Sequence, residues 1–203
     1  PPEVTGQELA AIDTRKVAVV DTRAWKAFRG GHAAGALYVP HDSMFPGIVG
    51  SYIGEDEDVV LIAERWQVDA MVRDMIRVGI DRVVGWADPS AMEVFAQAGG
   101  KVATTPEIDV AEAKRRVGDK EAFFLDVRRG DEFAAGHLPG ATLAPHTRLP
   151  AHLKDVPKNK RIIVNCRSGG RSGRACSLLQ REGYEVANVE GGWLAWDAME
   201  RGQ

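Results

Sequence analysis

The feature of this sequence that most constrains its fold is an internal repeat at a fixed offset of 105 residues. Asp21-Thr22-Arg23 corresponds to Asp126-Val127-Arg128, and Gly31-His32 corresponds to Gly136-His137. Agreement at several positions with one offset is the pattern that a duplicated domain leaves in a sequence. Further matches at this offset are Phe28 with Phe133, Gly35-Ala36 with Gly140-Ala141, and Pro40-His41 with Pro145-His146.

The repeat predicts two domains of similar fold. We place them at residues 1–103 and 104–203, because glycines and a proline interrupt the pattern over residues 99–106. Each half alternates short apolar runs with stretches of helical periodicity, so we predict an α/β fold, with a mainly parallel sheet flanked by helices on both faces in each domain. The predicted strands are Val17–Val20, Ala36–Val39, Val59–Ile62 and Arg82–Val84, then Ala122–Leu125, Ala141–Ala144, 161–165 and Glu185–Val189. The predicted helices of the second half are Ile108–Val117, with Asp109 as its cap, Gly130–Ala135, Ser172–Glu182 and Trp193–Glu200.

The composition is that of an ordinary globular protein. Of the 203 residues, 44% are hydrophobic and 27% are charged, and the formal net charge is −3, which gives no indication of a nucleic-acid surface. The apolar runs are only as long as strands, so we expect no membrane span. Two cysteines do not indicate a disulfide scaffold, so we expect a reducing, cytoplasmic location. The chain starts at Pro1 without Met, and we expect it to be part of a longer protein.

The segment Cys166–Ser172 is the strongest candidate for a functional site. It follows the apolar run Ile162–Val164 and precedes a predicted helix, which places a cysteine at the end of a buried strand. Glycines in the loop allow successive N–H groups to point inward, and the helix dipole also favours an anion there. Such a setting favours the thiolate, so we predict Cys166 as the nucleophile. The predicted anion-binding residues of the loop are Arg167, Ser168, Gly169, Gly170, Arg171 and Ser172, with Arg174 close behind.

Asp126 and Arg128 allow two interpretations. They recur as Asp21 and Arg23 in the first half, which favours a framework role, with Arg128 bound to Glu132 as one arrangement. Asp126 also ends a strand at the edge where α/β sheets place their binding loops. We therefore keep Asp126 and Arg128 as candidate substrate-binding residues.

Other conspicuous side chains have structural explanations. Cys176 lies on the apolar face of the predicted helix, and buried free cysteines are usually inert. The pairs Gly31-His32 and Gly136-His137 occur in both halves, which favours a role in a turn over catalysis. Trp193 and Trp196 have helical spacing and are expected in the core.

The second half resembles a rhodanese domain in five motifs: Asp126-Val127-Arg128, Glu132-Phe133, Gly136–Ala141, the Cys166–Ser172 loop and Gly191-Gly192-Trp193. The resemblance implies a sulfurtransferase that moves sulfane sulfur from thiosulfate or a persulfide to a thiol or cyanide. It implies that Cys166 carries the sulfur as a persulfide, that the partners are a small anionic donor and a thiol acceptor, and that no cofactor or metal takes part.

The length of the loop separates this chemistry from that of phosphatases. Cysteine-based phosphatases of related fold use Cys-x5-Arg, whereas Cys166 and Arg171 are separated by four residues and Ser172 stands at the phosphatase arginine position. A shorter loop suits one sulfur atom better than a tetrahedral oxyanion, so we favour sulfur transfer.

The first half resembles a degenerate, inactive rhodanese repeat. If Val59–Ile62 matches the strand of residues 161–165, Glu64 falls at the position of Cys166, and the following segment Arg65–Asp69 has no glycine. We expect its loop to be about two residues shorter. A rival hypothesis is therefore a non-catalytic docking or regulatory module of a larger enzyme.

The order of an inactive and then an active repeat is similar to the C-terminal tail of proteins that fuse a metallo-β-lactamase-fold persulfide dioxygenase to rhodanese domains. The stretches Gly54–Glu64 and Arg77–Asp81 carry this second resemblance. It implies an N-terminal metallo-β-lactamase-fold domain as a partner. The His-x-His-x-Asp-His motif of that domain is absent from this sequence, so we expect no metal site here.

Overall fold

The computed structural model describes residues 1–202 and divides the chain into two compact units, Pro1–Thr104 and Thr105–Gln203. The division falls one residue after the boundary that we expect from the repeat. Each unit has its own sheet and its own hydrophobic core, so the two are described separately, as unit 1 and unit 2.

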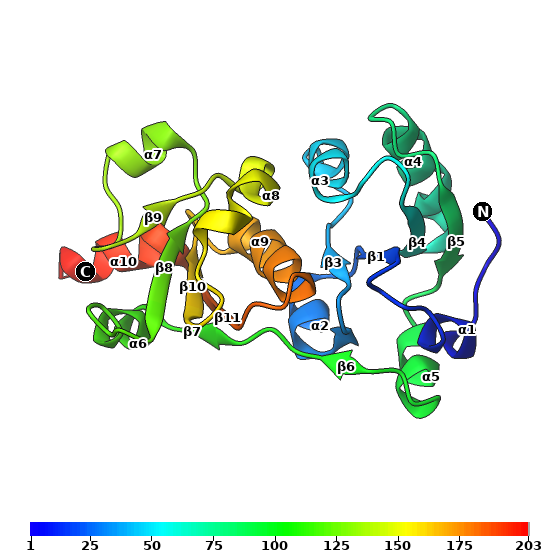
Figure 1. Cartoon of the computed structure of the whole chain (residues 1–203), viewed down its shortest axis with the longest axis horizontal. Coiled ribbons are helices and arrows are strands. Elements are labelled where there is room, and N and C mark those ends of the chain that lie inside the picture. The colour runs from blue at the N-terminus through cyan, green and yellow to red at the C-terminus, as the bar shows by residue number, and fades with distance from the viewer. Residues whose placement is uncertain (203) are drawn as a thin grey trace. The chain divides into compact units, whose positions relative to one another are not determined.

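Unit 1 is built on a parallel four-stranded sheet in the order β3-β1-β4-β5 (Figure 1). The amino terminus extends this sheet, because Glu3 forms a parallel bridge with Trp86 and the Val4 N–H donates to the Trp86 carbonyl at 2.8 Å. The sheet strands are β1 (Val17–Asp21), β3 (Leu37–Tyr38), β4 (Asp58–Ile62) and β5 (Val83–Ala87), and β2 (His32–Ala33) pairs with β6 (Val102–Ala103) in a separate antiparallel ribbon. The helices are α1 (Gly6–Ala10), α2 (Trp25–Gly30), α3 (Phe45–Tyr52), α4 (Arg65–Ile76) and α5 (Ala91–Gln97).

Unit 2 repeats this strand order and adds a fifth strand, giving the parallel sheet β7-β11-β10-β8-β9. Strand β7 takes the place that the bridge at Glu3 takes in unit 1. The strands are β7 (Glu107–Ile108), β8 (Ala122–Asp126), β9 (Thr142–Leu143), β10 (Arg161–Asn165) and β11 (Val186–Val189). The helices are α6 (Val110–Arg115), α7 (Gly130–Ala134), α8 (Leu149–His152), α9 (Gly170–Arg181) and α10 (Gly192–Glu200), with 3-10 turns at His146–Arg148 and Leu153–Asp155.

The core of unit 2 follows from the alternation of side chains along its strands. Phe124 and Ile163 point to one face, where they pack with Ala113 of α6 and Trp196 of α10. Val164, the next residue along β10, points to the other face, where α9 packs against β10 and β11. Both faces are thus covered by helices, as the near-continuous apolar strands predict.

The strand predicted at Arg82–Val84 begins one residue later and runs on to Ala87, and the helix predicted at Ile108–Val117 is wrong at its start. Ile108 is the end of β7 and not the start of a helix, because the Glu190 N–H donates to its carbonyl at 2.9 Å and draws it into the sheet. The helix begins at Val110, and Asp109 is its N-cap, as predicted, since its carboxylate accepts from the Glu112 N–H at 2.7 Å.

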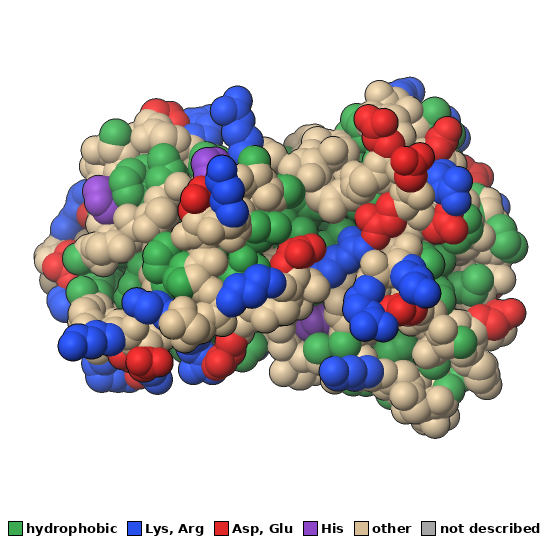
Figure 2. Space-filling view, viewed as in Figure 1, with side chains coloured by type: hydrophobic (Ala, Val, Ile, Leu, Met, Phe, Trp, Pro, Cys, Tyr) green, Lys and Arg blue, Asp and Glu red, His purple; other side chains and the backbone are tan. Residues whose placement is uncertain are grey.

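Side chains of both charges are interspersed over the face of the molecule that Figure 2 shows. Within residues 1–202, no helix has both the length and the apolar composition that crossing a bilayer requires.

Candidate active site

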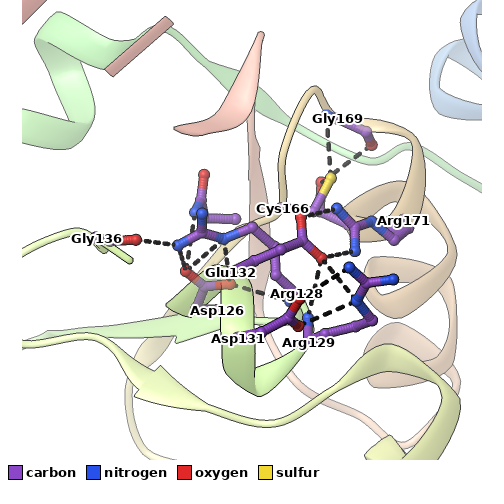
Figure 3. Close-up of polar contacts among 11 residues, drawn as sticks. Asp126, Arg128, Arg129, Asp131, Glu132, Gly136, Cys166, Gly169 and Arg171 are labelled. Atoms are coloured by element: carbon purple, nitrogen blue, oxygen red, sulfur yellow. Dashed lines mark hydrogen bonds and ion pairs between the residues drawn. The ribbon is translucent and has the colours of Figure 1, made fainter. Parts of the chain in front are cut away.

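Cys166 directly follows β10 at the carboxyl edge of the unit 2 sheet, and only 1% of the residue is exposed. Its Sγ accepts a hydrogen bond from the Gly169 N–H at 3.1 Å. The Ser172 hydroxyl lies 3.2 Å from Sγ and 3.0 Å from the Gly169 carbonyl, so its single proton serves one acceptor at a time. Figure 3 shows the sulfur turned toward Gly169. The loop thus places one amide donor at the sulfur, and the first turn of α9 adds a hydroxyl that is shared with the Gly169 carbonyl.

The loop turns into a helix at Gly169, which is the N-cap of α9. Its φ of 106° lies in the left-handed region, which favours glycine, and Gly170 does not share this conformation. Helix α9 begins at Gly170, two residues before the predicted start at Ser172. The amides of Gly170, Arg171 and Ser172 have no carbonyl in the preceding turn to bind, and together with the helix dipole they favour an anion at this end.

The start of α10 holds the first two peptide groups of the loop. The Trp193 N–H donates to the Cys166 carbonyl at 2.7 Å, and the Leu194 N–H donates to the Arg167 carbonyl at 3.0 Å. Because N–H and C=O point in opposite directions in a trans peptide, the amides of Arg167 and Ser168 point away from α10. Gly192, with φ 56°, packs so closely here that a Cβ would lie 2.4 Å from the Cys166 carbonyl oxygen.

Asp126 and Arg128 form a buried ion pair at the end of β8. Arg128 Nε lies 3.0 Å from both carboxylate oxygens of Asp126, and Nη2 lies 2.7 Å from Oδ2 and from the Gly136 carbonyl oxygen. The Arg128 guanidinium also lies 5.0 Å from the centre of the Trp193 ring. The arrangement of Arg128 with Glu132 is therefore wrong, because the turn at residues 126–128 brings the nearer carboxylate onto the guanidinium.

The same ion pair occurs in unit 1. Arg23 Nη2 lies 2.7 Å from Asp21 Oδ2 and 2.8 Å from the Gly31 carbonyl oxygen. Since unit 1 has no thiol, the pair is part of the framework of the fold.

The two Gly-His pairs are structural, as predicted. His32 stacks on Phe28 with ring centroids 3.9 Å apart, and His137 stacks on Phe133 at 3.8 Å. In both, Nδ1 lies within hydrogen-bond distance of the carbonyl oxygen four residues earlier.

Arg171 is held by Glu132 of α7. Its Nη1 donates to Glu132 Oε2 at 2.6 Å, and its Nη2 donates to Oε1 at 2.7 Å. These hydrogen bonds from Arg171 lower the pKa of Glu132 to about 2, against the opposing effect of burial. The guanidinium that the sequence suggests for binding an anionic donor is thus already bound to an internal carboxylate.

Comparison with known proteins identifies the family. The sequence model described as "Rhodanese-like domain" matches residues 109–199, within unit 2. A protein of Allochromatium vinosum named "Sulfurtransferase" is 38% identical over 92 residues, which are 44% of this chain and 86% of that protein. The chain belongs to the rhodanese-like family. YtwF of Bacillus subtilis is 36% identical over 92 residues, 45% of this chain and 89% of its own length. A solved rhodanese-like domain protein from Staphylococcus aureus is 33% identical, with 45% of this chain and 91% of that chain covered and a TM-score of 0.43.

The remaining predicted residues of the rhodanese-like loop differ in exposure. Arg167, Ser168 and Gly170 are exposed, whereas Arg174 is only 6% exposed. Buried His146, which the sequence analysis leaves without a role, is near this group. Burial, assisted by the charges of Arg171 and Arg174, lowers the pKa of His146 to about 4, so its ring is neutral at pH 7.

Cys176 of the rhodanese-like unit lies inside α9 and is fully buried. Burial raises the pKa of the Cys176 thiol well above its ordinary value. This keeps the thiol protonated, in agreement with the predicted inert role.

The strand register corrects the alignment of the two units at the cysteine position. Asp21 pairs with Ile62 on β4, and Asp126 pairs with Asn165 on β10, so these neighbouring strands match at an offset of 103. Ala63, which is 1% exposed, therefore occupies the position of Cys166, and the expectation of Glu64 there is wrong. The segment between strand and helix has two residues in unit 1, 63–64, and four in unit 2, 166–169, so the loop of unit 1 is two residues shorter, as predicted.

Proposed function

We propose that this protein is a sulfurtransferase in which Cys166 accepts and passes on one sulfane sulfur atom. One observation carries the proposal: the Cys166 sulfur lies at the carboxyl end of β10 with the Gly169 amide 3.1 Å away and the first turn of α9 directed at it. The family relation and the sulfurtransferase name of the Allochromatium vinosum relative support it.

In the first half-reaction the Cys166 thiolate attacks the outer sulfur of thiosulfate. A new S–S bond forms, the bond between the two sulfurs of the donor breaks, and sulfite leaves with the electron pair. The terminal sulfur of the persulfide then carries the negative charge. The amides of the loop and of the first turn of α9 are the groups available to stabilise it.

In the second half-reaction an acceptor thiolate, or cyanide, attacks the terminal sulfur of the persulfide. The S–S bond to Cys166 breaks, the acceptor leaves as a persulfide or as thiocyanate, and the Cys166 thiolate is regenerated. A small-molecule persulfide would serve as donor by the same exchange, with its thiolate as leaving group. The proposal requires a reducing compartment, because the cycle depends on a free thiol.

Unit 1 and the suggested partner domain have separate roles in this proposal. We propose that unit 1 takes no part in the chemistry, since Ala63 occupies the cysteine position. The metallo-β-lactamase-fold domain that the sequence suggests as a partner would be a persulfide dioxygenase, which consumes its persulfide, so it would receive the small persulfide that unit 2 releases in the second half-reaction.

The test is mass spectrometry of the protein after incubation with thiosulfate and removal of excess donor. We expect a gain of one sulfur on the peptide that contains Cys166, and loss of that sulfur on addition of cyanide. Cys166→Ser should abolish the gain, and the matched change Cys176→Ser should leave it intact. Unchanged thiosulfate turnover in Cys166→Ser would refute the assignment.

A further inference from the structure

We propose that Glu132 and Arg171 are positioning residues that hold the cysteine loop in its reactive conformation, and that Arg171 does not bind the sulfur donor. The inference rests on the proposed sulfur transfer and gives the most conspicuous arginine of the loop a different task from the one its sequence position suggests.

The contact between Glu132 and Arg171 joins both carboxylate oxygens to two guanidinium nitrogens. Arg171 directs two nitrogens at the two oxygens of Glu132, with distances of 2.6 and 2.7 Å. The Arg129 N–H lies a further 3.3 Å from Glu132 Oε2, and Figure 3 shows the carboxylate between the guanidinium groups of Arg129 and Arg171. About four-fifths of each side chain of the pair is buried. A planar two-point contact of this kind fixes orientation as well as distance.

The position of Arg171 on the chain links this contact to the thiol. It is the second residue of α9, and it lies between Gly169, which donates its N–H to Sγ, and Ser172, whose hydroxyl lies 3.2 Å from Sγ. The contact with Glu132 therefore anchors the first turn of α9 to α7, and with it both donors. A displacement of about 1 Å is enough to cost a large factor in rate when a reacting group is positioned in this way.

Unit 1 provides an internal control for this interpretation. It keeps the Asp21–Arg23 pair with the same Nη2–Oδ2 distance of 2.7 Å as in unit 2, although it has no thiol. At the offset of 105, however, Ala27 stands where Glu132 stands in unit 2. Helix α2 contains no acidic residue, and Ala27 lines a cavity of about 370 Å³ together with Arg23 and Glu64. The acidic side chain is present only in the unit that has a cysteine loop to hold.

The charge balance supports the same assignment. Glu132 is ionised throughout the physiological range, because Arg171 lowers its pKa to about 2, and it neutralises the guanidinium. Arg128 is likewise neutralised by Asp126. The negative charge of a bound donor thus meets neither of these guanidinium groups, and besides Arg167 and Arg174 it has the loop amides, whose direction the Glu132–Arg171 pair sets.

Steady-state kinetics with two donors of different charge, thiosulfate and glutathione persulfide, test the proposal. The variants are Glu132→Gln, Arg171→Lys and the exchange Glu132→Arg with Arg171→Glu, with Asp131→Asn as the matched control on α7. We expect Glu132→Gln and Arg171→Lys to lower kcat about 10- to 100-fold for both donors alike, with KM changed less than about threefold. The exchange should recover part of kcat, and Asp131→Asn should behave as the unaltered protein does.

An anion-binding role gives the opposite pattern. Glu132→Gln would then release a positive charge and lower KM for thiosulfate, and Arg171→Lys would raise KM for thiosulfate alone with kcat unchanged. Either result overturns the proposal. The rate of Cys166 alkylation by iodoacetamide measures the reactivity of the thiol without any sulfur transfer. We expect this rate to change by at least about threefold in both single variants. Failure of the unaltered protein to take up sulfur would refute the proposed function, whereas an unchanged alkylation rate would refute only the positioning role.

Discussion

The carboxyl edges of the two sheets share a framework but differ in what is built on it. In both units a buried aspartate–arginine pair lies at the end of the strand next to the edge strand, β1 or β8, and a histidine stacks on a phenylalanine four residues earlier. After β4, however, α4 begins at Arg65, whereas after β10 a loop intervenes and α9 begins at Gly170. The comparison shows that the most visible repeated motifs of the sequence belong to the framework of the fold, whereas the cysteine loop, on which the proposed chemistry depends, has no counterpart in unit 1.

The largest expected effect comes from removing the Cys166 sulfur, the atom that unit 1 lacks at the same position. Cys166→Ala places at the end of β10 the residue that Ala63 provides at the end of β4, and we expect complete loss of sulfur uptake with the fold retained. Thiosulfate–cyanide transfer and circular dichroism measure the two outcomes. The reciprocal change, Ala63→Cys with Cys166→Ala, should not restore activity, because no glycine loop follows Ala63. Restored turnover would show that a thiol at this edge is sufficient.

The next effect concerns the start of α10. A Cβ on Gly192 would lie 2.4 Å from the Cys166 carbonyl oxygen, and φ there is 56°. Gly192→Ala must therefore move the peptide that follows the cysteine. We expect about a 100-fold loss in kcat and a loss of about 1–3 kcal/mol in the free energy of unfolding. Gly202→Ala, a positive-φ glycine with open space around it, is the control for backbone strain alone. Native activity in Gly192→Ala would contradict the close packing.

A smaller effect distinguishes the two glycines of the loop. Gly169→Ala forces a side chain into φ 106° but meets no atom closer than 3.8 Å, so we expect a cost of about 1–2 kcal/mol and a loss in kcat of about tenfold. Gly170→Ala meets nothing within 4 Å and has no positive φ, so its kcat and unfolding midpoint should be close to native. Equal effects of the two changes would show that the loop depends on flexibility instead of one backbone conformation.

The smallest effect is on stability, and it contrasts His146 with its counterpart His41. His41 Nε2 lies 3.1 Å from an oxygen of Asp74. The buried Nδ1 of His146, by contrast, has no hydrogen-bond partner among residues 1–202. Because burial lowers the pKa of His146 to about 4, the unfolded chain binds this proton near pH 6.5 and the folded chain does not.

The contribution of His146 to stability is thus complete above pH 6.5 and is lost as the pH falls toward 4, up to about 3 kcal/mol. Urea denaturation at several pH values measures it. His146→Leu should show a weaker decrease over this interval than the unaltered protein, and an identical decrease would refute the assignment.

Much of the fold could be predicted from the sequence, because apolar runs of strand length alternate with helical periodicity in both halves. Positions that depend on contacts between distant segments could not. The partner of Arg171 is Glu132, 39 residues earlier, and no local pattern connects them. The correspondence of Ala63 with Cys166 needed the hydrogen-bond register, because the sequence offset changes between β1 and α4. The sequence predicts Ile108 in a helix because the strand that pairs with it, β11, is far along the chain, with Val189 opposite Ile108.

Trp193 and Leu194 supply the hydrogen bonds that hold the carbonyl groups of Cys166 and Arg167, and they lie more than 25 residues further along the chain. A ribosome therefore makes the reactive cysteine well before it makes the donors that orient its loop. A nascent or proteolytically shortened polypeptide that ends before Gly192 contains the thiol but not the geometry. The order of synthesis would thus delay the proposed sulfur chemistry until α10 has folded onto the sheet.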